Sequence, residues 1–196
     1  MRIDSHHHIW DLSVRDQEWI TGDAMQPIRR NFVISDLQDV IAGSHINRTI
    51  LVQTITDYAE TPELLAIAQS DQLIGAVVGW LKIDAPDAIS HLHRYLDLPG
   101  GEYLKGIRDI AQDHPDSNYL AKPETIANVQ KLGELGITYD LLTKTPELAA
   151  AIKLVRACPD VQFVMDHISK PYIAKKEIEP WKTLITELAT FPNVSC

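Results

Sequence analysis

The sequence predicts an α/β protein of the (β/α)8 TIM-barrel type whose barrel is incomplete, with about six to seven of the eight strands present. Short apolar, β-branched runs alternate with longer amphipathic stretches, which is the pattern of parallel strands connected by helices. Residues able to do chemistry recur at the carboxyl ends of these runs, where a barrel places its active site. An open doubly wound sheet is the alternative, but no glycine-rich turn follows the first strand and no Walker-type loop is present.

The first strand, predicted over residues 2–9, contains three consecutive histidines. Side chains alternate between the two faces of a strand, so Asp4, His6 and His8 would point one way and His7 the other. Two imidazoles on one face, two residues apart, can approach one metal ion or one substrate group. The alternative is a polar strand end with surface histidines.

The following elements are predicted from their boundaries and from their apolar runs. Residues 11–31 form a long irregular connection, the kind of loop that often builds a lid or a wall. Ser35 is expected to cap a helix over residues 36–42. Thr-Pro-Glu at residues 61–63 and again at 145–147 is typical of a helix start. Further strands are expected at 48–54, 73–80, 104–110, 137–142 and 161–168, and further helices at 61–69, 87–96, 123–135, 145–157 and 179–190.

A seventh strand opens at residues 193–196. A full barrel takes about 250 residues, so we expect a single domain over residues 1–196 that lacks its C-terminal strands. Such a sheet would expose its edges and its apolar interior. We therefore expect poor solubility of the chain alone, or a homo-oligomer or a second fragment that covers them.

The composition suits a globular domain, with 196 residues of which 45% are hydrophobic and 23% charged. A net charge of -9 argues against nucleic acid and anionic membranes as partners. No apolar run approaches the roughly 20 residues that span a bilayer. Two unclustered cysteines, Cys158 and Cys196, are typical of reduced thiols, so we expect a cytoplasmic protein acting on a small molecule.

Several residues at strand ends are candidates for the site. We expect His167 to join His6 and His8, although it could instead cap a helix, and Asp166 would face the opposite way by alternation. Arg108 suits a substrate carboxylate or carbonyl, unless it forms a structural ion pair with Asp109 or Asp113. The candidates for the substrate-binding wall, each of which could instead be core, are Trp10, Gln53, Trp80 and Tyr139, the last with Asp140 as its alternative.

The opening Ile-Asp-Ser-His-His-His-Ile-Trp-Asp at residues 3–11 resembles the start of the amidohydrolase-2 family. The resemblance continues through Leu-Val-Gln at 51–53, Lys-Gly-Ile-Arg at 105–108 with Gln-Asp at 112–113 after it, and Phe-Val-Met-Asp-His-Ile-Ser-Lys-Pro at 163–171, in the same order. These are (β/α)8 hydrolases that include sugar-acid lactonases and 2-pyrone-4,6-dicarboxylate hydrolase. The chain departs from the family in two places: Asp109 stands where many relatives have a histidine, and the chain ends before the strand that carries the family's water-activating aspartate.

The resemblance implies a hydrolase that opens a lactone by attack of water on the carbonyl. His6, His8 and His167 would line the site as catalytic residues and as ligands of one divalent, zinc-like metal, with a metal-independent site as the alternative. Arg108 would anchor the substrate. Two other hypotheses stay open, a metal-dependent non-oxidative decarboxylase of the same fold and an inactive fragment.

Overall fold

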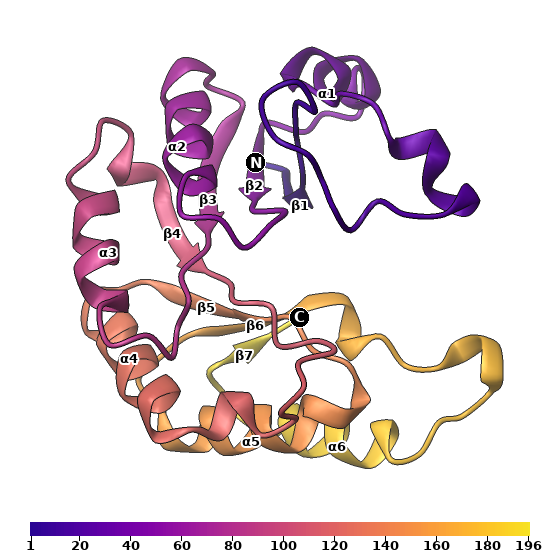
Figure 1. The fold of residues 1–196 in the computed structure, drawn as a ribbon, viewed down its shortest axis with the longest axis vertical. Coiled ribbons are helices and arrows are strands. Elements are labelled where there is room, and N and C mark those ends of the chain that lie inside the picture. Colours follow the sequence, from indigo (N-terminus) through magenta and orange to yellow (C-terminus); the bar gives the residue numbers. More distant parts are fainter.

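The computed structural model describes residues 1–196 and contains a seven-stranded parallel sheet with its strands in chain order (Figure 1). The sheet curls, so the strands form part of a barrel wall, as the sequence predicts. β1 and β7 are its two edges, and each pairs with a single neighbour. The strands are β1 (Ile3–His7), β2 (Arg48–Val52), β3 (Ile74–Gly79), β4 (Leu104–Ile107), β5 (Thr138–Leu141), β6 (Phe163–Met165) and β7 (Val194–Ser195).

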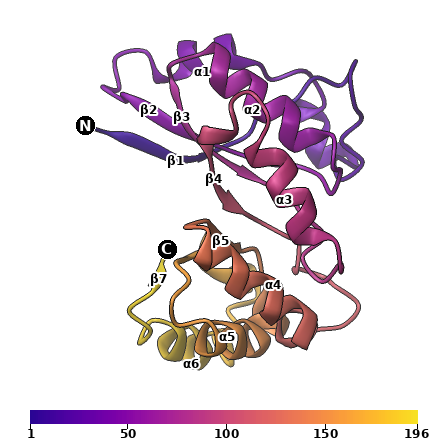
Figure 2. The ribbon, with the colours of Figure 1, turned by 90° about the vertical axis from the view of Figure 1, so that its left-hand side faces the viewer.

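Helices connect successive strands and pack on the outside of the curled sheet (Figure 2). They are α1 (Ile34–Ile41), α2 (Glu60–Ser70), α3 (Ala88–Leu96), α4 (Pro123–Glu134), α5 (Leu148–Ala157) and α6 (Trp181–Leu188). One continuous cluster of 32 buried apolar residues fills the space between the layers. This packing supplies most of the stabilisation, because buried apolar area contributes about 25 cal/mol per Å².

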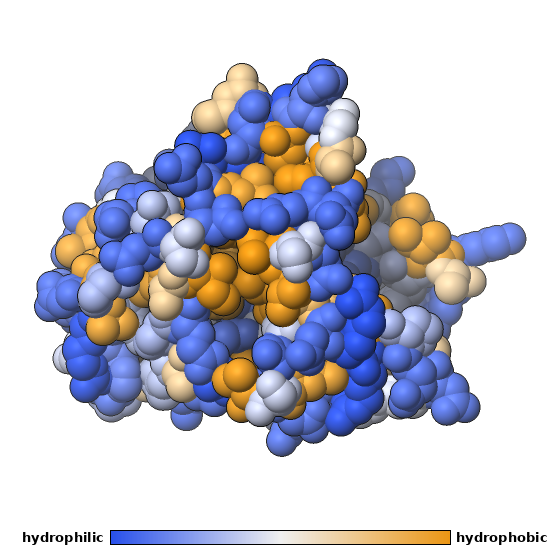
Figure 3. Space-filling view, turned by 90° about the horizontal axis from the view of Figure 1, so that it is seen from above, coloured by the Kyte–Doolittle hydropathy of each residue, from blue (hydrophilic) through white to orange (hydrophobic).

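α1 packs more loosely than the other helices. It has no buried residue, and Val40 is 82% exposed. Seen from the end of the molecule where α1 and α2 lie, apolar side chains gather near the centre with hydrophilic ones around them (Figure 3). Ser35 lies inside the helix rather than at its cap, because the helix begins at Ile34 with Val33 at the N-cap position; the Val33 amide donates to Asp36 Oδ2 at 2.8 Å.

None of the helices is both long and apolar enough to cross a lipid bilayer.

The strands end earlier than the sequence pattern predicts. β1 stops at His7 instead of Ile9, β4 at Ile107 instead of Ile110, and β6 at Met165 instead of Ile168. The residues that follow belong to the loops at the barrel mouth: alternation still holds for His8 after β1, but it fails after β6. This difference changes the geometry of the site after β6.

After β6 the backbone makes a left-handed turn of four consecutive residues, His167 to Lys170, with φ values of 52°, 47°, 55° and 44°. Left-handed conformation costs an L-residue roughly 1–2 kcal/mol, so the surroundings must hold this turn. They do so through two contacts. The buried Ser169 hydroxyl bonds the Thr143 hydroxyl at 2.6 Å, and the Trp181 indole donates to the Ile168 carbonyl at 2.7 Å.

Candidate active site

Five residues of the site each lie one position beyond the end of a strand. His8 follows β1, Gln53 follows β2, Trp80 follows β3, Arg108 follows β4 and Asp166 follows β6. All the strands are parallel, so their carboxyl ends meet at the same mouth. The fold therefore gathers residues that are far apart in the chain.

Arg108 lies at the centre of this layer and is only 3% exposed. Its Nη2 donates to the Gln53 carbonyl, and the Gln53 side-chain amide donates back to the Arg108 carbonyl at 3.1 Å. Its Nη1 forms an ion pair with Asp166 at 2.8 Å. The ion pair considered in the sequence analysis therefore exists, but its partner is Asp166 and neither Asp109 nor Asp113.

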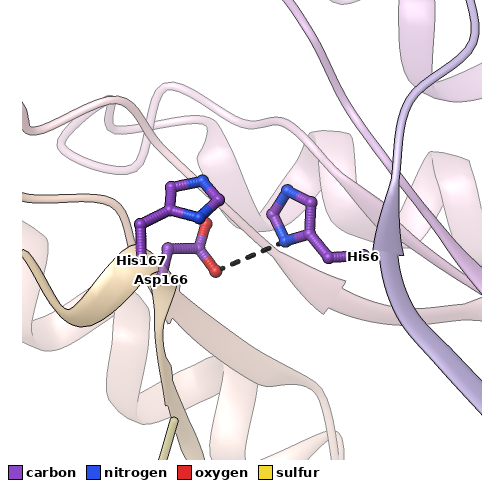
Figure 4. Close-up of side chains that lie close together, drawn as sticks. All are labelled: His6, Asp166 and His167. Atoms are coloured by element: carbon purple, nitrogen blue, oxygen red, sulfur yellow. Dashed lines mark ion pairs between the residues drawn. The ribbon is translucent and has the colours of Figure 1, made fainter. Parts of the chain in front are cut away.

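His6 contacts the residues that follow β1 and those that follow β6. Its Nε2 lies 3.2 Å from His8 Nε2, so the two imidazoles meet as alternation predicts. Its Nδ1 lies 3.6 Å from Asp166 Oδ1, the contact drawn in Figure 4, and its ring centroid is 4.9 Å from that of His167. His7 points elsewhere and bonds the Thr49 hydroxyl at 2.9 Å.

Asp166 and His167 both face His6 (Figure 4). The sequence analysis placed them on opposite faces because it extended the strand through Ile168. His167 instead begins the left-handed turn, which rotates its side chain toward the same cluster as Asp166. Asp166 is thus a site residue that strand alternation misplaces.

The imidazoles are held in the neutral form. Burial lowers the pKa of His6 to about 4 and that of His8 to about 3, with the Arg108 cation adding to both shifts while Asp166 opposes the shift at His6. Burial also lowers the pKa of His167. A neutral imidazole keeps a lone pair available to a metal, a proton or a polar substrate.

The donor set fits a divalent metal. Ligand atoms of His6, Asp166 and His167 lie within 4.8 Å of one another. His8 Nδ1 bonds the Val52 carbonyl at 2.8 Å, which leaves its Nε2 free to act as an acceptor. Zinc–nitrogen bonds of about 2.0–2.1 Å in a tetrahedral site set ligand nitrogens about 3.3 Å apart, close to the 3.2 Å between His6 and His8. The cluster thus contains two of the three expected histidines, His6 and His167, together with Asp166, and His8 lies beside His6.

Asp109 supports one wall of the site. Its carboxylate accepts the Trp80 indole at 2.8 Å, the Ile83 amide at 3.0 Å and the Tyr119 hydroxyl. Burial and the adjacent carboxylate raise the pKa of the Tyr119 hydroxyl, which keeps it a donor. Asp109 therefore anchors the loops after β3 and β4 to each other.

A cleft of about 900 Å³ opens above this layer. His8, Trp80, Arg108 and His167 line it, together with four residues for which the sequence predicts no role in the site: Trp19, Tyr58, Gln112 and Lys170. The Tyr58 ring packs against the Trp80 ring at a tilt of 58°, with the centroids 4.8 Å apart, and so widens the aromatic wall. Aromatic side chains scattered over separate loops give no pattern by which the sequence could reveal this wall.

The remaining expected wall residues lie elsewhere. Trp10 lines a separate, mainly apolar cavity of about 470 Å³ beside α2, and its indole donates to the Arg30 carbonyl. Gln53 is fully buried beneath the cleft, where it holds Arg108. Tyr139 is fully buried in the core, whereas its neighbour Asp140 packs against the site from below.

Asp140 is a buried acid that the mouth layer covers. It is 3% exposed, and its Oδ1 has no hydrogen-bond partner. Burial, and then the Asp166 carboxylate, raise its pKa to about 7, while the Arg108 cation opposes the shift. The site therefore rests on a carboxyl group that changes charge near neutral pH.

A parallel barrel wall with histidines, an arginine and an acid at its mouth defines the class of protein. The chain belongs to the amidohydrolase family, whose model matches residues 3–196.

The relatives carry a more specific name. The chain is 31% identical over 195 residues to an L-fucono-1,5-lactonase from Burkholderia ambifaria, and 29% identical over 212 residues to one from Burkholderia multivorans. Both comparisons cover 100% of this chain, which spans 66% and 67% of those relatives' length. A solved amidohydrolase from Burkholderia multivorans with bound zinc superimposes with a TM-score of 0.90 at 28% identity, covering 100% of this chain and 68% of that one.

Proposed function

We propose that this protein is a lactonase that opens a sugar-acid lactone, with a 1,5-lactone related to L-fuconolactone as the first substrate to test. The single observation that carries the proposal is the mouth cluster, in which three neutral histidines, Arg108 and Asp166 meet beneath a cleft. The similarity to two proteins named L-fucono-1,5-lactonase supports the choice of substrate. Aromatic-degradation lactones are the second class to test.

The proposed chemistry is hydrolysis of a cyclic ester. Water adds to the lactone carbonyl, the ring carbon–oxygen bond breaks, and the products are a hydroxyl group, a carboxylate and one proton. The transition state carries negative charge on the former carbonyl oxygen, so donors aimed at that oxygen lower the barrier.

The residues of the cluster have different roles in this reaction. Asp166 holds the Arg108 guanidinium in place, and that cation orients and polarises the carbonyl. His8 is oriented by its bonds to the Val52 carbonyl and to His6, and it lines the cleft. Activation of the attacking water is the one role that the proposal does not assign to these residues.

A divalent ion, when bound, would supply a Lewis acid that polarises the carbonyl. His6, Asp166 and His167 would hold it, with His8 beside them. Neutral imidazoles and a carboxylate are ligands that zinc prefers. The solved Burkholderia multivorans relative contains bound zinc, which supports the choice of zinc as the first ion to test.

A pH-stat assay with a panel of lactones tests the proposal, because each ring opening releases one proton. We expect sugar-acid 1,5-lactones to be opened well above the buffer rate and to yield the hydroxy acid. Analysis of the products separates this activity from decarboxylation, which would release carbon dioxide from an aromatic acid. Failure to open any lactone above the buffer rate would refute the proposal.

A further inference from the structure

Lys170 is the cation in the cleft wall that has no acidic partner. Three cationic side chains line the cleft, and two of them form ion pairs: Arg15 with Asp57 and Glu63, and Arg108 with Asp166. Lys170 is half-buried and forms no direct ion pair; Asp166 and Asp113 act on it only through longer-range attraction, against burial and the cations Lys144 and Arg108. A half-buried charge without a counter-ion is costly, so a role in binding would account for it.

The polar contacts of Lys170 leave most of its donors free. Its ammonium donates to the Gln112 side-chain oxygen, which is its single hydrogen bond within the protein. An ammonium has three donors, so two remain unused. The Gln112 side-chain nitrogen likewise has no partner in the protein, and both residues line the cleft. The free groups of Lys170 and Gln112 that line the cleft are therefore all hydrogen-bond donors.

A strained segment of the backbone positions Lys170 in the cleft wall. Lys170 is the last residue of the left-handed turn, and its amide donates to the His167 carbonyl at 2.9 Å. The buried contact between Ser169 and Thr143 fixes the middle of the same turn. One strained turn thus points both His167 and Lys170 into the cleft, and strain of this kind clusters at functional sites.

We propose that Lys170 and Gln112 form a carboxylate-binding subsite that recognises the acid produced by ring opening. The inference rests on the proposed function and deepens it. A neutral lactone becomes a hydroxy acid with one negative charge, and a patch of donors distinguishes the two. Lys170 favours the charge as it develops on the carboxyl group, so it lowers the energy of the transition state more than that of the substrate.

Calorimetric titration at pH 7.5 tests the subsite with two probes. One is L-fuconate, an open-chain acid, and the other is 1,5-anhydro-L-fucitol, a neutral ring. We expect Lys170→Met to weaken binding of L-fuconate at least tenfold and binding of the neutral ring less than twofold. Gln112→Leu should weaken L-fuconate binding severalfold, and Lys170→Arg should retain it within about threefold.

Lys175→Met is the matched control, since it removes the same charge from an exposed position on the same loop. Equal affinity of wild type and Lys170→Met for L-fuconate would overturn the inference. An equal loss for the neutral ring, an equal loss in Lys175→Met, or no binding of L-fuconate to the wild type would overturn it as well. Loss of L-fuconate binding in a protein that opens no lactone would uphold the subsite and refute the proposed function.

Discussion

Replacing Asp140 with asparagine should stabilise the protein in a pH-dependent way. The folded state raises the pKa of this carboxyl from 3.8 to about 7, chiefly through burial and then through Asp166, with Arg108 and Thr138 opposing the shift. A group whose pKa is raised by folding leaves stability unaffected below its unfolded pKa and reduces it as the pH rises through the folded value. The cost therefore grows between about pH 4 and pH 7.

The size of the effect follows from the shift. Each pKa unit is worth about 1.4 kcal/mol, so the full cost at high pH is on the order of 4 kcal/mol, of which about 3 kcal/mol develops above pH 5. Asparagine has nearly the same shape and carries no charge. The advantage of Asp140→Asn over wild type should thus grow by about 3 kcal/mol between pH 5 and pH 8.5.

Urea unfolding at the two pH values measures this difference directly. The variant's midpoint should move up relative to wild type by roughly 1 M or more between pH 5 and pH 8.5, for a slope of about 1–3 kcal/mol per molar urea. Asp160→Asn, at an exposed position after α5, controls for the loss of one carboxylate. A difference that does not change with pH would refute the argument from burial.

Three further predictions concern the supports of the site and its ligands. Asp109→Ala removes the acceptor of four donors, the fourth being the Ile110 amide, and should lower the free energy of unfolding by about 3 kcal/mol; an unchanged melting temperature would contradict this. Zn²⁺ should bind the wild type in calorimetric titration and bind His167→Ala at least tenfold more weakly, with exposed His45→Ala as the control; equal binding would argue against the ligand set. Burial raises the pKa of Cys158 to about 11, so a thiol reagent at pH 8 should label Cys196 alone until denaturant is added.

Much of the fold could be predicted from local patterns. Apolar runs and Thr-Pro-Glu helix starts located the alternating elements, and alternation along β1 brought His6 and His8 together while turning His7 away. These features depend on residues within a few positions of one another. Periodicity therefore captures them.

The rest of the site depends on features without a local signal. Arg108 meets Asp166 because the curled sheet brings the ends of β4 and β6 together across β5, and no spacing in the chain encodes that distance. His167 and Asp166 share one side because of a left-handed turn in a stretch that contains neither glycine nor asparagine. Glycine and asparagine are the usual markers of positive φ. Because neither is present, the sequence indicates a strand that continues through Ile168.

The central claim is that the paired histidines of β1 belong to a lactone-hydrolysing site. It is tested most directly by the ratio of kcat/KM for opening L-fucono-1,5-lactone between wild type and His8→Ala, with His7→Ala as the matched neighbour. We predict a fall of about 100-fold or more for His8→Ala, as expected for the loss of a group that acts on the transition state, and a change within about threefold for His7→Ala, whose side chain bonds Thr49 outside the site. Undiminished turnover in His8→Ala would contradict the account.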